Sequence, residues 1–359
     1  MVIYLKKRVK FIISMLAIFC IFAFAKTNYI SIQNTIQIFL ESVMPSLFPF
    51  IFLTNIILQS NILDVITSKF KKYGNLIYIA LIGSFCGYPM GAKATYMLYN
   101  KKLVSKNEAY FLMSFANNCN PIFILSTIGI GVLNNIKLAI ILMICHYTSS
   151  LIICIYYFTH NNIIHKNDEK SNSFSKKEDT ALHNLTTFEK VDTAIKQTFL
   201  TLSNILAFIL LFNLAFSVVE NILLKLNISE NIIYTLSGIF EVTGGIRLIY
   251  LNSTLPQNIT LTIISFVLSF SGMAIIFQIY SCIYKIPIKL SHIFKYKLMQ
   301  GLISAIMTYI LVSIIKSTDY INLNLKPAST LFNETLTYII AVALLFTICF
   351  TLKKVTRKS

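Results

Sequence analysis

Residues 76–99 of the chain read LIYIALIGSFCGYPMGAKATYMLY. This apolar block is long enough to cross a bilayer, which takes about 20 residues in an α-helix, but the stretch GYPMG at residues 87–91 interrupts it. Glycine and proline break helices, because one adds backbone freedom and the other removes an amide donor. A second block, residues 231–251, is interrupted by Gly244 and Gly245. The path of these two blocks through a membrane decides the topology of the chain.

The rest of the chain also consists of long apolar blocks. Of its 359 residues, 56% are hydrophobic and only 13% are charged, which is about half of the charged share of a soluble domain. The other blocks cover residues 11–26, 30–60, 108–133, 136–159, 195–224, 259–284, 293–316 and 336–352. We therefore expect an all-α polytopic membrane protein with about eight full transmembrane helices and two re-entrant or broken helical hairpins.

The net charge of +17 indicates the orientation. If both interrupted blocks are hairpins that enter and leave on one side, most lysines and arginines fall on the side of the N-terminus, as the positive-inside rule requires. If both blocks are full spans, the basic clusters at 101–106 and 160–196 move to the opposite side. The charge pattern therefore favours hairpins and cytoplasmic N- and C-termini. Because topology accounts for the basic composition, we expect a lipid bilayer as partner and no nucleic acid.

Two halves of the chain resemble each other. GAKATYM at residues 91–97 aligns with GIRLIYL at residues 245–251, with a glycine, a cation, a tyrosine and a large apolar residue in register. Each half holds an odd number of full crossings, so the second copy inserts upside down, as in many secondary transporters. The predicted domains are an N-terminal transmembrane helix, a first repeat, a polar cytoplasmic linker, a second inverted repeat, and a C-terminal transmembrane helix with a basic tail: residues 1–29, 30–159, 160–192, 193–316 and 317–359.

The first apolar run has a second interpretation. Lysines and an arginine precede it and small residues end it, so it also resembles a cleaved signal peptide. An uncleaved first helix is favoured, because many further spans follow. Both interpretations place the start of the chain in the cytoplasm.

The interruptions suggest a binding site. A helix that starts inside the membrane carries free amide donors and partial positive charge at its N-terminus. Each interruption combines helix-breaking residues with a cation shortly after them: Gly87, Pro89, Gly91 and Lys93 in the first block, and Gly244, Gly245 and Arg247 in the second. We therefore expect a carboxylate- or phosphate-bearing substrate between the two hairpin tips. In the alternative, both side chains extend to the membrane–water interface, or they pair with Glu241 and with helix C-termini.

Polar residues in other spans complete the candidate site. Asn117, Asn118 and Asn120 lie inside block 108–133, and Ser269 and Ser271 are their counterparts in the second half. We expect these side chains to line the substrate path, with interhelical hydrogen bonding as the alternative.

Three further residues are candidates for coupling or gating. They are Glu241, which is an acid within an apolar block, His146, which is the one histidine of block 136–159, and Ser46, which lies between two prolines. Their alternative roles are charge balance for Arg247, an interhelical hydrogen bond, and a helix kink.

Catalytic and metal-binding patterns are missing from the sequence. It contains no HExxH, GxSxG or P-loop pattern and no paired nucleophile and base, so we expect neither an enzyme nor a cofactor. The seven cysteines form no CxxC pair, which argues against a disulfide framework or a zinc site. We expect the partner to be a small anionic solute. The sequence permits an oligomer and identifies no coupling ion.

Three motifs carry a resemblance to a known family. PSLFPF at residues 45–50, GYPMGAK at 87–93 and NNCNPIF at 117–123 resemble the sporulation integral membrane protein YlbJ (SpoVV) family. That family belongs to the nucleoside-recognition, or gate-domain, superfamily related to concentrative nucleoside transporters. The resemblance extends over residues 40–310.

The resemblance implies a function. It implies a carrier that moves dipicolinate across the outer forespore membrane during sporulation, by alternating access between two inverted repeats. Dipicolinate is a pyridine with two carboxylates, which would suit the two predicted cations. The alternatives are a nucleoside carrier on the same scaffold and a non-transporting membrane scaffold or sensor needed for assembly of the spore cortex.

Overall fold

A computed structural model describes residues 15, 19, 22–59, 73–161 and 186–315. Every element in this part of the chain is helical. Three predicted segments lie wholly or largely outside the described residues: the first span at 11–26, the linker at 160–192, and the C-terminal helix and basic tail at 317–359. The prediction of an all-helical chain is thus confirmed over the described ranges.

Five helices in the described ranges are long and apolar enough to cross a membrane. They cover Ala25–Leu58, Ile136–His160, Phe188–Lys225, Gln257–Ile283 and Leu290–Ile314. Large apolar side chains point outward from them, and Leu200, Leu211 and Ile306 are each more than half exposed. A surface of this kind is typical of helices that face hydrocarbon. The expected total of about eight full crossings remains a prediction.

The first part of the described chain is one long helix with an irregular turn. Helix α2 (Ala25–Ile38) continues through the π-helical turn η1 (Phe39–Val43) into α3 (Met44–Gln59). Pro49 lies inside α3, where it cannot donate a backbone hydrogen bond. Ser46 donates its hydroxyl to the Val43 carbonyl at 2.9 Å. This bond stays within the irregular region, which supports the kink interpretation of Ser46.

Two short helices then form the first helical pair. Helix α5 (Gly74–Phe85) and helix α6 (Met90–Asn100) pack side by side. We call residues 86–89, which join them, the first tip. Gly87 has a φ of 81°, in the left-handed region that favours glycine, and its carbonyl accepts the Met90 amide at 3.0 Å. The Tyr88–Pro89 peptide bond is cis.

The next helix is broken near its middle. Helix α7 (Lys106–Phe115) starts with a capping box between Ser105 and Glu108, and the π-helix η3 (Phe123–Ile130) follows a non-helical stretch. We call residues 116–120 the break. The break presses on the first helical pair, because a Cβ on Gly83 or Gly91 would stand 1.7 or 2.2 Å from the Ala116 carbonyl oxygen. These glycines therefore permit the close approach. Helix α8 (Ile136–His160) ends this half.

The second part repeats this order of elements. Helix α10 (Thr187–Lys225) has 39 residues and is followed by the pair α11 (Glu230–Phe240) and α12 (Val242–Asn252). We call residues 241–244, where this pair reverses, the second tip. Helix α13 (Gln257–Phe270) is separated from α14 (Gly272–Ile283) by Ser271, whose φ is 72°. Helix α15 (Leu290–Ile315) ends the described chain.

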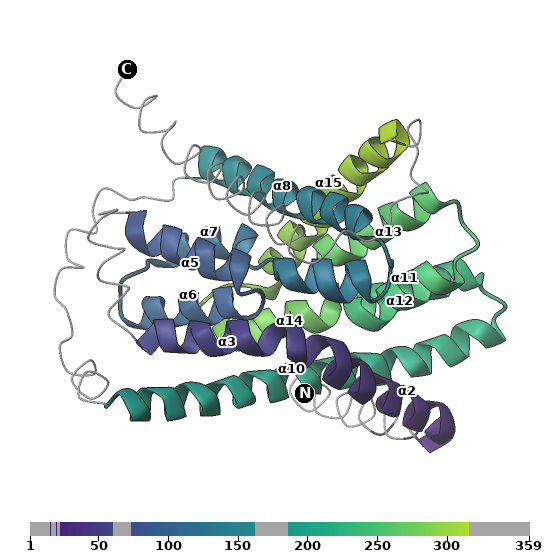
Figure 1. The fold of residues 1–359 in the computed structure, drawn as a ribbon, viewed down its shortest axis with the longest axis horizontal. Coiled ribbons are helices and arrows are strands. Elements are labelled where there is room, and N and C mark those ends of the chain that lie inside the picture. Colours follow the sequence, from purple (N-terminus) through teal and green to yellow (C-terminus); the bar gives the residue numbers. More distant parts are fainter. Residues whose placement is uncertain (1–14, 16–18, 20–21, 60–72, 162–185, 316–359) are drawn as a thin grey trace, which may run out of the picture.

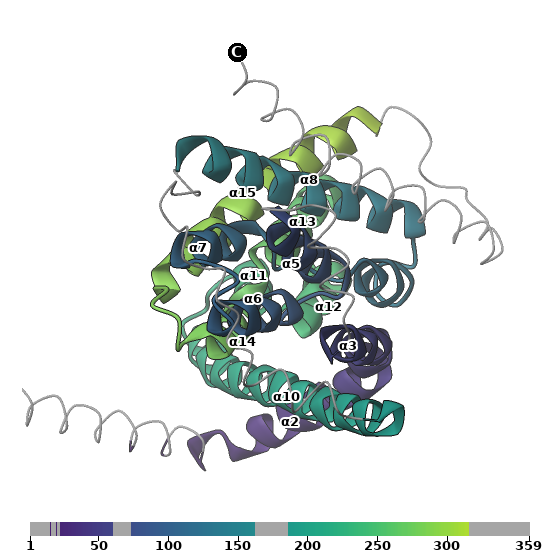
Figure 2. The ribbon, with the colours of Figure 1, turned by 90° about the vertical axis from the view of Figure 1, so that its left-hand side faces the viewer.

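The two helical pairs enter the molecule from opposite ends. In Figure 1, α5 and α6 lie at the left end and α11 and α12 at the right end, so their tips approach each other in the middle. Figures 1 and 2 place α8 and α15 along one side of the pairs, and α2 and α10 along the other. The sequence repeat and this arrangement agree in element order. The division into inverted domains at the predicted bounds remains a prediction.

Candidate functional site

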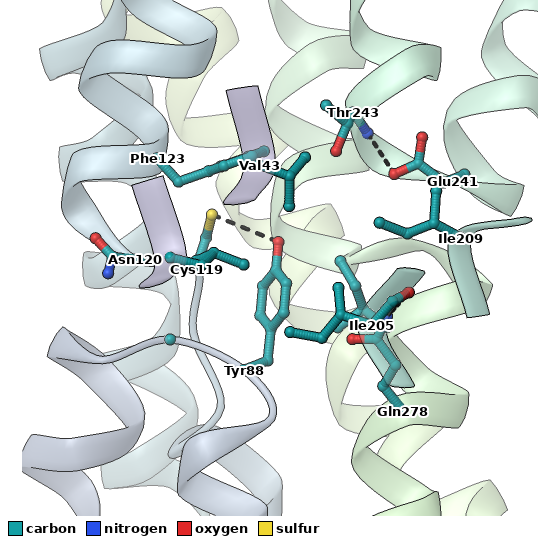
Figure 3. Close-up of a pocket in the computed structure, with 13 residues that line it drawn as sticks. Val43, Tyr88, Cys119, Asn120, Phe123, Ile205, Ile209, Glu241, Thr243 and Gln278 are labelled. Atoms are coloured by element: carbon teal, nitrogen blue, oxygen red, sulfur yellow. Dashed lines mark hydrogen bonds between the residues drawn. The ribbon is translucent and has the colours of Figure 1, made fainter. Parts of the chain in front are cut away.

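A small cavity lies where the two tips approach each other (Figure 3). It is lined by both tips, by the break, and by helices α3, α10 and α14 with the turns η1 and η3: Val43, Leu47, Gly87, Tyr88, Cys119, Asn120, Phe123, Ile205, Ile209, Glu241, Thr243, Ile275 and Gln278. We call it the central cavity. Its volume is about 20 Å³, which is little more than one water molecule needs. In this conformation the walls are therefore closed too tightly for a solute that carries a ring.

A second, smaller cavity lies next to the central one. It has a volume of about 10 Å³ and shares Glu241 and Thr243 with it, while Thr35 and Asn213 supply further polar lining. The Asn213 amide donates to the Thr35 hydroxyl at 2.9 Å. Glu241 is 3% exposed, and of the described residues it alone is charged among those lining the two cavities.

The Glu241 carboxylate caps a helix. One oxygen accepts the Thr243 amide at 2.8 Å and the other accepts the Gly244 amide at 2.7 Å. Glu241 itself is extended, with φ −143° and ψ 127°, which is the usual backbone of a residue that precedes a helix. The carboxylate thus satisfies amides that the start of α12 leaves free, and the helix dipole stabilises its negative charge.

Two polar atoms in the lining of the central cavity have no hydrogen-bond partner within the described part of the chain. They are Nδ2 of Asn120 and Oε1 of Gln278, and both side chains are at most 2% exposed. The orientation of each amide is set by its other atom. Asn120 Oδ1 accepts the Ile122 amide at 2.7 Å, and Gln278 Nε2 donates to the Ile205 carbonyl at 3.3 Å. A free donor from the first half and a free acceptor from the second therefore border one cavity.

A buried lysine lies behind the break. Lys297 on α15 is 1% exposed, and its ammonium donates to the Asn117 carbonyl and, at 3.0 Å, to Gln300 Oε1. Among the described residues it makes no ion pair. Placing a lysine in the core of a membrane protein costs about 2.5–3.5 kcal/mol even on permissive scales. A cation retained there without a carboxylate partner is a strong indication of a functional role.

Hydrogen bonds around Lys297 join the two halves of the chain. Gln300 donates to Asn118 Oδ1 at 2.9 Å, so α15 contacts the break through two side chains. Asn118 in turn donates to the Phe115 carbonyl and to the Ser150 hydroxyl on α8, both at 3.0 Å. All five of these residues are buried. Asn118 is therefore used in interhelical bonding rather than in lining the cavity.

His146 on α8 is held in one tautomer by its neighbours. Its Nε2 accepts the Cys119 amide at 3.1 Å, and its Nδ1 lies 2.9 Å from the Ser269 hydroxyl. Because Nε2 accepts, the neutral ring carries its proton on Nδ1 and donates it to Ser269. The arrangement favours the interhelical hydrogen bond over a coupling role for His146, and it explains the burial of Ser269.

The two predicted cations do not meet. Lys93 is half-buried on α6, and its ammonium donates to Asn55 on α3 at 3.0 Å and to Gln197 on α10 at 3.3 Å. Arg247 on α12 is exposed. Neither lines the central cavity. The expectation that both face one cavity is not met in this conformation, because Lys93 bonds to α3 and α10 and Arg247 is exposed.

The second interruption also differs from the prediction. The chain reverses at Glu241, three residues before Gly244, and both glycines belong to the first turn of α12. Gly245 instead allows close helix packing, since a Cβ there would stand 2.2 Å from the Gly238 Cα. In the first pair the prediction fits better, because Pro89 directly precedes α6 and Gly91 lies in its first turn.

The predicted residues therefore divide into two groups. Gly87, Asn120 and Glu241 line the central cavity. The others are not in its lining: Pro89, Gly91, Lys93, Gly244, Gly245, Arg247, Asn117, Asn118, Ser269, Ser271, His146 and Ser46. Ser271 is fully buried and donates weakly to the Ser269 carbonyl at 3.5 Å.

Sequence reasoning missed Gln278, Tyr88 and Lys297. Tyr88 projects from the first tip into the central cavity, where its hydroxyl lies 3.5 Å from Cys119 Sγ (Figure 3). Lys297 lies near the start of the predicted block 293–316, where the positive-inside rule treats a lysine as the mark of a span end. One signal could have identified it: four polar residues of α15 recur at helical spacing and are buried, namely Lys297, Gln300, Ser304 and Thr308.

Comparison with known proteins finds similarity to a sporulation protein. Over 305 residues, the chain is 27% identical to the sporulation integral membrane protein YlbJ of Bacillus subtilis (strain 168), and the alignment covers 76% of this chain and 74% of that protein. The similarity supports the family resemblance carried by the motifs at residues 45–50, 87–93 and 117–123. No protein-family model matches the chain, and no solved structure matches it.

Proposed function

We propose that this chain, a member of the YlbJ family of sporulation integral membrane proteins, is a membrane carrier for a small solute. The observation that supports this most directly is the central cavity between the two tips. Its lining holds an unpaired donor on Asn120 and an unpaired acceptor on Gln278. Leaving a buried polar group without a partner costs about 1–3 kcal/mol, so such groups are typical of a site that receives a ligand.

The geometry also suits alternating access. The two helical pairs come from opposite ends of the molecule (Figure 1), and each contributes one tip to the cavity wall. The cavity of about 20 Å³ must widen before a solute enters, and movement of one tip at a time would open it to one side at a time. We assign the described conformation to the closed part of this cycle.

We propose dipicolinate as the solute, carried across the outer forespore membrane during sporulation. The resemblance to the YlbJ family supports this assignment. The donor of Asn120 suits a carboxylate oxygen, and the buried ammonium of Lys297 lies behind the same break. Both features attract a negatively charged solute.

Uptake into vesicles tests the proposal. Purified full-length protein is reconstituted into liposomes, and the entry of labelled dipicolinate is compared with entry into protein-free liposomes. We expect saturable uptake only where the protein is present. The variant Asn120→Asp keeps the oxygen that accepts the Ile122 amide and replaces the free donor with a negative oxygen, so uptake should fall by about tenfold or more.

A matched variant controls for damage to a helix start. Asn135→Asp changes another asparagine whose Oδ1 accepts backbone amides, two in this case, at the start of α8 and outside the cavity. It should transport like the wild type. Equal uptake by the wild type and Asn120→Asp would exclude the central cavity as the site. Absence of dipicolinate uptake by the wild type would contradict the proposed solute.

A nucleoside carrier is the second candidate. The observation that favours it is that, among the described residues, no lysine or arginine lines the central cavity, because an amide donor and an amide acceptor can pair with the edge of a neutral base. Uptake of labelled uridine that dipicolinate fails to inhibit would select this candidate. A non-transporting scaffold or sensor predicts uptake of neither compound.

A further inference from the structure

The strongest unexplained feature of the molecule is the ammonium of Lys297. Its two acceptors are neutral oxygens, the Asn117 carbonyl and Gln300 Oε1. Lys297 makes no ion pair among the described residues, and the side chains that continue its hydrogen-bond network are the amides of Gln300 and Asn118 and the Ser150 hydroxyl. A charge held among neutral groups, away from water, is weakly screened and acts over a longer distance than a charge at the surface.

The position of Lys297 relates it to the central cavity. The carbonyl that it holds belongs to Asn117 in the break, and Cys119 and Asn120, two and three residues later, form part of the cavity wall. Lys297 therefore lies directly behind the wall rather than in it. The opposite wall contributes Glu241, but two backbone amides already stabilise that carboxylate. The charge on the side of the break is thus positive, whereas the negative charge of Glu241 lies at the opposite wall, held by the start of α12.

We propose that Lys297 is a positioning residue that sets the charge preference of the central cavity, so that the carrier favours solutes bearing carboxylates over neutral solutes of the same shape. It acts through the break, by holding the Asn117 carbonyl, and through its charge. This inference rests on the proposed carrier function and adds a residue that determines its specificity. It replaces the predicted pair of tip cations with one cation from α15.

The test compares two ligands that differ in charge but not in shape. Dipicolinate carries two carboxylates, and pyridine-2,6-dicarboxamide carries two neutral amides on the same ring. Binding of each to the purified full-length protein is measured by competition against labelled dipicolinate. We expect the wild type to bind dipicolinate about tenfold or more tightly than the diamide, because the poorly screened charge of Lys297 attracts a carboxylate. Equal affinity for both compounds in the wild type would overturn the inference without any variant.

Three variants separate charge from structure. Lys297→Met removes the charge and the hydrogen bonds, and Lys297→Gln removes the charge but keeps a donor for the Asn117 carbonyl. Lys295→Met is the control, since Lys295 lies two residues away on the same helix and is exposed. Thermal unfolding in detergent verifies that each variant is folded. If Lys297→Met does not fold, Lys297→Gln carries the comparison.

The outcomes are distinct. We expect both Lys297 variants to lose the preference for dipicolinate while their affinity for the diamide stays within about twofold, and Lys295→Met to resemble the wild type. A uniform loss of affinity for both compounds would show a purely structural role and overturn the inference, as would a full preference in Lys297→Gln. If the protein transports dipicolinate and every variant keeps the preference of the wild type, the inference is overturned and the proposed function stands. A wild type that binds neither compound overturns the inference together with the proposed solute.

Discussion

Individual side chains in the central cavity keep polar atoms that the fold does not use. Gln278 is 2% exposed, yet its Oε1 has no partner and its Nε2 makes one long bond, 3.3 Å, to the Ile205 carbonyl. Such a residue contributes little to the stability of the folded protein, because the desolvation of the amide offsets most of that bond. Its retention is better explained by a solute that reaches the free oxygen.

Replacing Gln278 by methionine separates function from stability. The variant Gln278→Met keeps the volume and flexibility of the side chain and removes the unpaired oxygen. We expect its stability to stay within about 1 kcal/mol of the wild type, while solute uptake into liposomes falls by about tenfold. Thermal unfolding in detergent and initial uptake rates check the two effects. Gln257→Met, an exposed position on α13, is the control, and a fall in stability without a fall in uptake would contradict this role for Gln278.

At the scale of secondary structure, the start of α12 depends on a carboxylate buried in the cavity wall. Substitution of a capping side chain by alanine costs about 1 kcal/mol, and Glu241 accepts two amides. We expect Glu241→Ala to lower stability by about 1–2 kcal/mol and to impair uptake, because the second tip loses its fixed geometry. Thermal unfolding and uptake in the same preparations measure both.

A helix start outside the cavity provides the comparison. Asn135 accepts two amides at the beginning of α8, as Glu241 does for α12. Asn135→Ala should therefore lower stability to a similar extent and leave uptake unchanged. If both variants impaired uptake equally, a general loss of folding rather than the second tip would be responsible.

The interrupted blocks were well located from sequence, but their chemistry was not. The predicted block at 76–99 became α5 and α6 over residues 74–100, and the block at 231–251 became α11 and α12 over residues 230–252, since apolar length and turn residues are local signals. The position of Gln278 in a wall opposite Asn120 is not local. It depends on α14 packing beside α6 and α10, which no spacing in the sequence encodes.

Charge was the weakest guide to the site. The positive-inside rule treats lysines as markers of span ends, so Lys297 was assigned to a flank, although α8 and α13 pack against α15 and bury it. Conversely, Lys93 and Arg247 attracted attention because they follow helix breakers. Neither residue lines the central cavity, since Lys93 bonds to α3 and α10 and Arg247 is exposed.

At the scale of the whole molecule, a carrier must expose the central cavity in turn to each side. Cys119 lines that cavity and is 1% exposed in the closed conformation, whereas Cys145 on α8 is fully buried away from it. We expect a small maleimide to modify Cys119 in membranes under transport conditions and to leave Cys145 unmodified. Dipicolinate should slow the reaction at Cys119. Mass spectrometry of the labelled peptides measures the extent of modification at each cysteine. Equal protection of the two thiols under all conditions would contradict the expectation that the central cavity opens.

Helix α10 has 39 residues and is therefore about 58 Å long, nearly twice the thickness of a hydrocarbon core of about 30 Å. A helix of this length tilts or extends beyond the bilayer, and its tilt follows the thickness of the surrounding lipid. Because Ile205 and Ile209 on α10 form part of the cavity wall, a change in membrane thickness moves that wall. The lipid composition of the host membrane thus becomes a determinant of how readily the cavity opens.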